Sequence, residues 1–173
     1  RFHNLKTLKL INLDLDIFPS PPAPFVPITR LILHSVEIVD GFLSQMVHGA
    51  SLKLVDIAAK SPAEYDEQVR LVLEVCEVDE LRYNLETPRR GDRPFLDLDR
   101  DDPLSMRCLQ LSGHAFDGGL LTAIVQHCGK LEDLVVAGRS SSVTSEDWAN
   151  FINSRAIPSL TRLSLPGGTH LPP

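Results

Sequence analysis

One six-residue pattern recurs along the chain: an apolar residue, two of any kind, an apolar residue, one of any kind, and a third apolar residue. It reads LKTLKL at its first occurrence and LTRLSL at its last. Its copies are separated by 23, 24, 26, 28, 25 and 29 residues, because they start at Leu5, Ile28, Leu52, Val78, Met106, Leu131 and Leu160. A spacing of roughly 20–29 residues kept over so many copies is typical of repeat proteins.

The second half of each hexapeptide has the alternation of a β-strand. Alternate side chains of a strand point to the same face, so Leu8 and Leu10 face one way and Lys9 faces the other. A single repeat cannot bury its apolar face, whereas stacked repeats share one core. The long return segments favour parallel pairing. We therefore expect an α/β fold with strands near residues 5–11, 28–34, 52–58, 78–84, 106–112, 131–137 and 160–166.

Most return segments contain residues that favour the start of a helix. Asp40, Ser61 and Asp117 stand where an N-cap residue is expected, and Thr144 begins a pattern that predicts a capping box. The first return differs, because residues 17–27 hold five prolines. Proline lacks the amide proton that a helix needs, so this segment is expected to be extended.

These features resemble the leucine-rich repeat superfamily, in its long-repeat, ribonuclease-inhibitor-like form. A narrower resemblance, to the cysteine-containing repeats of F-box proteins, depends on CGKLEDLVV at 128–136 and on the helix entries FDGGLL and VDGFLS. The resemblance covers Leu5 to Leu165 and implies a horseshoe-shaped solenoid with parallel strands on its concave face and helices or irregular returns on its convex face. It implies a single domain over 1–173 with about seven repeats, which we expect to be a fragment of a longer protein.

Composition narrows the classes of partner and compartment. A net charge of −6 and a pI near 5.4 disfavour nucleic acid and anionic membranes as partners. No apolar run approaches the roughly 18 residues of a spanning helix. The sparse, odd set of cysteines, Cys76, Cys108 and Cys128, favours a reducing compartment, so we expect a cytoplasmic or nuclear protein. Cys128 stands between a predicted helix and a predicted strand, as a filler of apolar space or as a reactive thiol.

Motifs for catalysis and metal binding are missing from the sequence. There is no phosphate-binding glycine loop and no nucleophile elbow, so we expect no enzyme and no cofactor. Asp97, Asp99 and Asp101 match the first ligand spacings of a calcium loop. Asp102 replaces the required glycine and Cys108 the final glutamate, so no metal site is expected.

Residues 86–103 form a charged insertion in the return path of the fourth repeat. The segment shows little helical periodicity and is dense in arginine and aspartate. A tolerated surface insertion and a partner-binding loop both fit this composition. Phe95 and Leu96 are expected to anchor the segment on the convex side.

The expected function is that of a protein–protein interaction scaffold. The resemblance implies the substrate-recognition region of an F-box-type ubiquitin ligase subunit; the alternative is a GTPase-activating or other regulatory leucine-rich repeat protein. We expect a monomeric chain within a larger complex. Arginines on the concave face are candidate hot spots, and its apolar residues are expected to form a strip. The predicted binding residues are Lys9, Arg30, Ile32, His34, Leu54, Asp56, Glu80, Arg82, Asn84, Gln110, Asp133, Val135 and Arg162.

Overall fold

The computed structural model describes residues 4–18, 28–60, 62–86, 95–138, 142–155 and 157–165. Seven strands form one sheet in the order β1-β2-β4-β6-β7-β8-β9, and β3 and β5 form a separate pair. Every pairing between the described strands is parallel, which confirms the predicted α/β class and strand direction. The elements are β1 (Thr7–Asp16), β2 (Arg30–Asp40), α1 (Leu43–Val47), β3 (Ser51–Leu52), β4 (Leu54–Ala59), α2 (Pro62–Val75), β5 (Glu77–Val78), β6 (Glu80–Leu85), β7 (Cys108–Ser112), α3 (Gly118–His127), β8 (Asp133–Ala137), α4 (Ser145–Ser154) and β9 (Arg162–Ser164).

The sheet keeps the hexapeptides in register, so equivalent apolar residues form rows across it. Leu31 pairs with Val55, which pairs with Leu81, and the row continues through Leu109 to Leu134. Each of these five side chains is at most 1% exposed. Burying a side chain of this size contributes roughly 1.5–3 kcal/mol. Each predicted strand segment therefore overlaps one strand of the large sheet, and the apolar residues of the repeated pattern form the buried rows.

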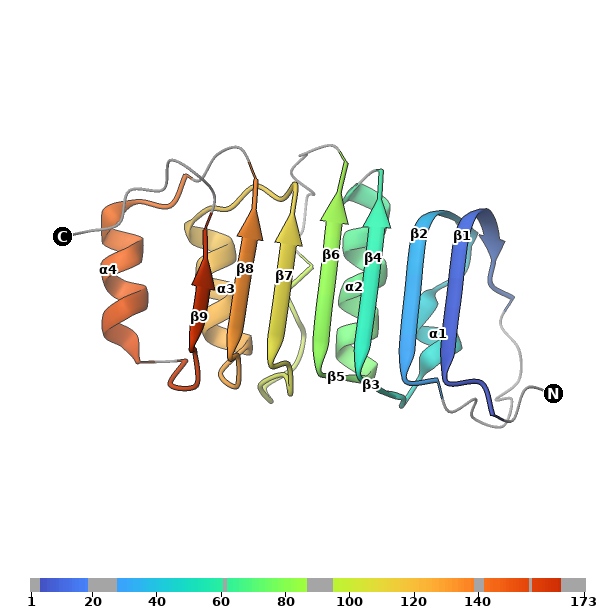
Figure 1. The fold of residues 1–173 in the computed structure, drawn as a ribbon, viewed down its shortest axis with the longest axis horizontal. Helices are drawn as coiled ribbons and strands as arrows, with labels where there is room; N and C mark the ends of the chain where they lie inside the picture. The colour runs from blue at the N-terminus through green and yellow to red at the C-terminus, as the bar shows by residue number, and fades with distance from the viewer. Residues whose placement is uncertain are drawn as a thin grey trace.

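Helices α1, α2 and α3 lie behind the sheet when it is viewed from its open side, and α4 lies beyond β9 at the end of the sheet (Figure 1). Two predicted caps are confirmed. The Asp117 carboxylate accepts a hydrogen bond from the Leu120 amide at 2.9 Å, and Thr144 forms a reciprocal capping box with Asp147. The predicted cap Ser61 and most of the proline-rich return lie outside the described residues.

The predicted cap of the first helix is wrong. Asp40 is the last residue of β2, and its carboxylate accepts a hydrogen bond from the Gly41 amide at 2.8 Å. Helix α1 begins later, and a side chain of α2 caps it: Gln68 Oε1 accepts from the Leu43 amide at 2.8 Å. The Gln68 Nε2 group also donates to the Gly41 carbonyl at 3.1 Å. A neighbouring helix thus supplies the cap.

Strands β1 and β2 extend beyond their predicted ends. Asn12 and Ser35 have positive φ angles of 53° and 52°, and pairing resumes after them at Leu13 and Val36. Asparagine tolerates the left-handed conformation better than most residues. The two strands therefore bend together without separating.

The described part of the charged insertion is packed against the helices behind the sheet, as expected for Phe95 and Leu96. Both side chains are buried, at 2% and 0% exposure. The Phe95 ring meets the Tyr83 ring edge-on, with centroids 5.4 Å apart. The Arg100 guanidinium donates to the Leu73 carbonyl of α2 at 3.0 Å. From Phe95 onward this segment covers the core in place of a helix.

Cys128 fills buried space where α3 ends. Its side chain is fully buried, and its amide donates to the Ile124 carbonyl at 2.9 Å. Burial raises the pKa of its thiol to about 12. A thiol in this state is almost entirely protonated at neutral pH and is a poor nucleophile. Of the two interpretations of Cys128, the structure therefore favours the filler of apolar space.

Candidate protein-binding face

The side chains of the large sheet that point away from the helices form a surface that we call the open sheet face. Exposed or half-exposed residues alternate along its strands with buried ones, as in Arg30, Ile32 and His34 of β2. Strand register places these residues in columns that cross the sheet, so that Ile32 lies beside Asp56 and Asp56 beside Arg82. No described helix covers this side of the sheet (Figure 1). The alternation brings all thirteen predicted residues to one face.

Leu54 is a correction to the predicted binding set. It begins β4 at an open-face position, but its side chain is only 5% exposed. Arg30 is its partner in β2, and Glu80 occupies the equivalent position in β6. Long aliphatic stems on both sides can shield a leucine from water. Leu54 is therefore unavailable as a contact residue.

The expected apolar strip is also interrupted. Ile32 and Val135 are half-buried and share one column of the face. The residues between them in that column are Asp56, Arg82 and Gln110. The open sheet face is therefore a polar surface with separate apolar points.

Two of the three predicted hot-spot arginines are already paired with carboxylates. Arg82 Nη2 lies 2.6 Å from Glu80 Oε1, and Arg162 Nη2 lies 2.7 Å from Asp133 Oδ2. The hydrogen bond from Arg82 to Glu80 raises the pKa of the Arg82 guanidinium. His34, which has no obvious carboxylate partner in the sequence, lies 3.3 Å from Asp56. These pairs leave the middle and the β9 end of the face locally close to neutral.

The β1 end of the face has a different charge distribution. Residues 4–13 and 28–36 contain Lys6, Lys9 and Arg30 but no acidic residue. All three cations are exposed, and none has an ion-pair partner among the described residues. Lys6 was not predicted, because it lies at the entry to β1 rather than within an alternating strand position. The sequence reveals this cluster only when the strand register is known, because the register brings Lys6 and Lys9 of one repeat close to Arg30 of the next.

A buried polar network lies on the helix side of the sheet and was not predicted. Tyr83 donates from its hydroxyl to Asp66 at 2.8 Å, and its carbonyl lies 3.1 Å from His114 Nε2. Burial raises the pKa of Asp66 to about 6, although the Tyr83 hydrogen bond opposes that shift. Burial lowers the pKa of His114 to about 4. The network links α2 to β6 and the segment after β7, and it opens onto no part of the open sheet face.

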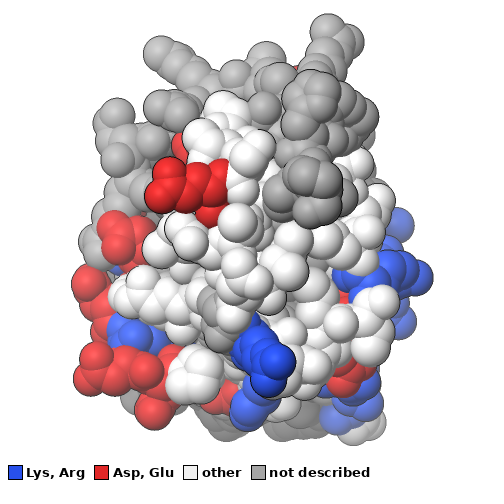
Figure 2. Space-filling model, turned by 90° about the vertical axis from the view of Figure 1, so that its left-hand side faces the viewer, with Lys and Arg blue, Asp and Glu red and all other residues white. Residues whose placement is uncertain are grey.

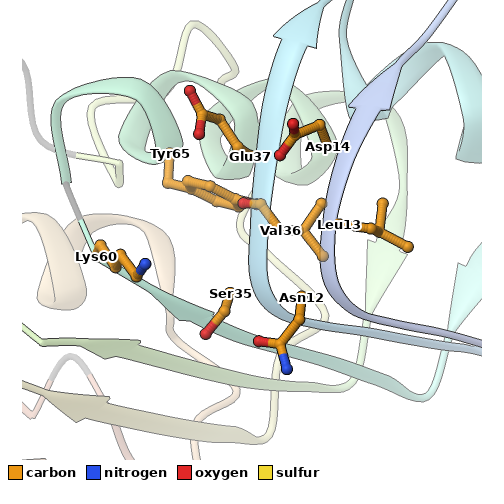
Figure 3. A pocket seen from close by; sticks show the side chains of 8 residues that line it. All are labelled: Asn12, Leu13, Asp14, Ser35, Val36, Glu37, Lys60 and Tyr65. Atoms are coloured by element: carbon orange, nitrogen blue, oxygen red, sulfur yellow. The ribbon is translucent and has the colours of Figure 1, made fainter.

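A hollow of about 450 Å³ lies where β1 and β2 bend (Figure 3). Tyr65 of α2 forms one wall, and its hydroxyl donates to the Val36 carbonyl. Asp14 and Glu37, which are register partners, bring two carboxylates to it, and Lys60 brings an ammonium group. No group of three or more histidine, cysteine or acidic residues in the described ranges is arranged to hold a metal.

The end of the sheet formed by β9 and α4 is less charged than the margins around it. Figure 2 shows this end, whose described centre is mostly uncharged. The exposed apolar side chains there include Ile152, at 58%, and Leu163, at 39%. Strand β9 is an edge strand of the described sheet. An unpaired strand edge is a template for further pairing.

Comparisons with protein-family models, with curated proteins and with solved structures find no match for this chain. Within the described residues, no helix has both the length and the apolar character needed to cross a bilayer.

Proposed function

We propose that this protein is a leucine-rich repeat scaffold that binds a protein partner across the open sheet face. The observation that carries the proposal is the array of exposed and half-buried polar side chains that the seven strands of the large sheet contribute and that the described helices leave uncovered. We assign it no catalytic role, because the thiol on this face, Cys108, lies between Glu80 and Asp133. Partial burial and these two carboxylates raise the pKa of that thiol, which disfavours the nucleophilic thiolate.

The dimensions of the face suit a folded partner or an extended peptide. Seven strands spaced about 4.8 Å apart span roughly 29 Å. Multiplied by about 17 Å along each strand, this gives a projected area of roughly 500 Å². A stable pair of proteins buries about 800 Å² on each partner. A tightly bound partner therefore also contacts the loops at the strand ends.

The finer proposal is the substrate-recognition region of an F-box-type ubiquitin ligase subunit, acting in a cytoplasmic or nuclear complex. Support comes from the long repeats and from Cys128, which stands buried at a helix-to-strand junction as in the cysteine-containing repeats that the sequence resembles. Co-purification of the parent protein with the ligase adaptor tests this assignment. A parent protein that assembles without the adaptor would favour a regulatory leucine-rich repeat protein without a ligase role.

Affinity capture with paired variants tests the role of the face itself. Gln110→Arg with Val135→Arg places two bulky charges at half-buried positions of the open sheet face. Gln126→Arg with Asn153→Arg places the same charges on exposed positions of α3 and α4. We expect the first pair to abolish capture of the specific partner and the second to retain it. Retention by both pairs would overturn the proposal.

A further inference from the structure

We propose that the β1 end of the open sheet face binds an acidic segment of the partner that also carries apolar side chains. The binding surface consists of Lys9, Ile11, Arg30 and Ile32 on the open sheet face, together with Lys6 at the entry to β1. We call the three cations, Lys6, Lys9 and Arg30, the basic patch. This proposal depends on the proposed function, because it specifies which partner chemistry the face selects.

Strand register makes the basic patch compact. The Lys6 carbonyl accepts hydrogen bonds from the Thr29 amide at 2.8 Å and from the Arg30 amide at 3.0 Å. Thr7 is the register partner of Arg30. Lys9 lies two residues after Thr7 and therefore points to the same face of the sheet as Thr7 and Arg30. Neighbouring strands are about 4.8 Å apart and residues rise about 3.3 Å, so the three cations lie within roughly 10 Å of one another at their Cα atoms.

Among the described acids, Asp56 lies near the basic patch, on the strand next to Arg30, whereas Glu80 and Asp79 lie farther along the sheet. Leu54 is the register partner of Arg30, and Asp56 lies two residues further along β4. The Asp56 carboxylate is 3.3 Å from the His34 ring. Glu80 is paired with Arg82. Asp79 stands at the entry to β6, beside Lys53 rather than beside the basic patch. A neutral His34 leaves the charge of Asp56 in place, so three cations face one carboxylate here and the basic patch keeps a net positive charge. Arg82 and Arg162 are instead each paired with a carboxylate of their own.

Two apolar side chains adjoin the cations and favour a peptide over a nucleic acid. Ile11 is 44% exposed and shares its strand face with Lys9, while Ile32 is the register partner of Lys9. Proteins that bind single-stranded nucleic acids stack bases on aromatic side chains. The open-face positions of the described strands hold no phenylalanine, tyrosine or tryptophan, and His34 is their one aromatic ring. Acidic residues interleaved with apolar ones would complement both components of this surface.

The test measures binding of a fluorescent peptide of roughly twelve residues, long enough to cross β1 to β4, with alternating glutamate and leucine. A matched peptide carries glutamine in place of glutamate, and a single-stranded oligodeoxynucleotide of equal charge is the third ligand. Anisotropy is recorded at about 0.01 M salt, where the Debye length is about 30 Å, and again at high salt. The proteins are the wild type, Lys9→Gln with Arg30→Gln, and Arg82→Gln with Arg162→Gln. Both double variants remove two positive charges.

We expect the wild type to prefer the glutamate peptide, and Lys9→Gln with Arg30→Gln to weaken that binding about tenfold. Each of the two removed cations, at roughly 6 Å from a peptide carboxylate in water, contributes close to a factor of three to the binding constant. Arg82→Gln with Arg162→Gln should change it by less than about threefold, because β6 and β9 lie outside the strands β1 to β4 that the peptide crosses, and the interaction weakens with distance. Equal losses in the two variants, equal binding of the glutamine peptide, tighter binding of the oligonucleotide, or no binding would each overturn the proposal.

Failure of this proposal is separable from failure of the proposed function. A partner that is lost on Gln110→Arg with Val135→Arg but is insensitive to Lys9→Gln with Arg30→Gln would retain the role of the face and refute the basic patch. A partner insensitive to all four substitutions would refute both. Matching thermal melts confirm that each variant is folded.

Discussion

Replacing Asp66 by asparagine should increase the stability of the fold relative to the wild type as the pH rises. The Asp66 carboxyl is only 8% exposed and accepts a hydrogen bond from the Tyr83 hydroxyl. Burial raises its pKa from the usual 3.8 to about 6. A carboxyl with a raised pKa holds its proton more tightly in the folded state than in the unfolded state. Its ionisation therefore opposes folding, and this cost is small near pH 4 and complete above pH 6.

The size of the effect follows from the pKa difference. A shift from 3.8 to about 6 corresponds to roughly 3 kcal/mol at pH 7, and about 2 kcal/mol of it develops between pH 4 and pH 7. His114 acts in the opposite direction, because burial lowers its pKa to about 4 and its protonation opposes folding as the pH falls. The wild-type profile is therefore flattened. Since His114 is present in both proteins, it cancels from their difference.

Urea unfolding of the wild type and Asp66→Asn at several pH values between 4 and 7 measures this difference. The free energy of unfolding of the variant minus that of the wild type should increase by about 2 kcal/mol from pH 4 to pH 7. An unpaired amide proton on the introduced asparagine would add a constant offset without changing the slope. Asp101→Asn, at an exposed position, is the control and should change stability by less than about 0.5 kcal/mol. A difference that stays constant with pH would refute the reasoning about burial.

Two further predictions concern the turn after β7 and the thiols. Gly113 has φ +76°, and a Cβ there would lie 2.1 Å from the Leu85 carbonyl oxygen, so Gly113→Ala should lower the free energy of unfolding by at least about 2 kcal/mol. Gly138→Ala, at the equivalent place after β8, meets its nearest atom at 3.7 Å and should change it by less than about 1 kcal/mol; similar losses in urea unfolding would contradict this account. Among the thiols, Cys108 alone is not buried, so native alkylation followed by mass spectrometry should modify it first. Equally rapid modification of the two buried cysteines would be inconsistent with this packing.

The strands could be predicted because one pattern determines both their positions and their faces. Leu31, Leu81 and Leu109 recur at positions that must be buried, and each buried position also defines its outward neighbours. The caps at Asp117 and Thr144 were predictable for the same reason, since a local hydrogen bond depends only on nearby residues.

The errors arose where a distant residue decides the outcome. Asp40 is of a residue type that often caps helices, but the side chain of Gln68, on another helix, caps α1 instead. Leu54 alternates like an exposed residue and is nevertheless shielded between neighbouring strands. The pairing of His34 with Asp56 depends on a register that brings residues of neighbouring repeats together only after the sheet has formed. Local periodicity carries no information on such contacts.

A photo-crosslinking comparison tests the central claim most directly. One protein carries the crosslinking residue in place of Gln110 on the open sheet face, and the other carries it in place of Gln126 on the exposed side of α3. With the purified specific partner, we expect a crosslinked product from position 110 and none from position 126. A product from position 126 alone would mean that the partner binds the helices, and it would contradict the account.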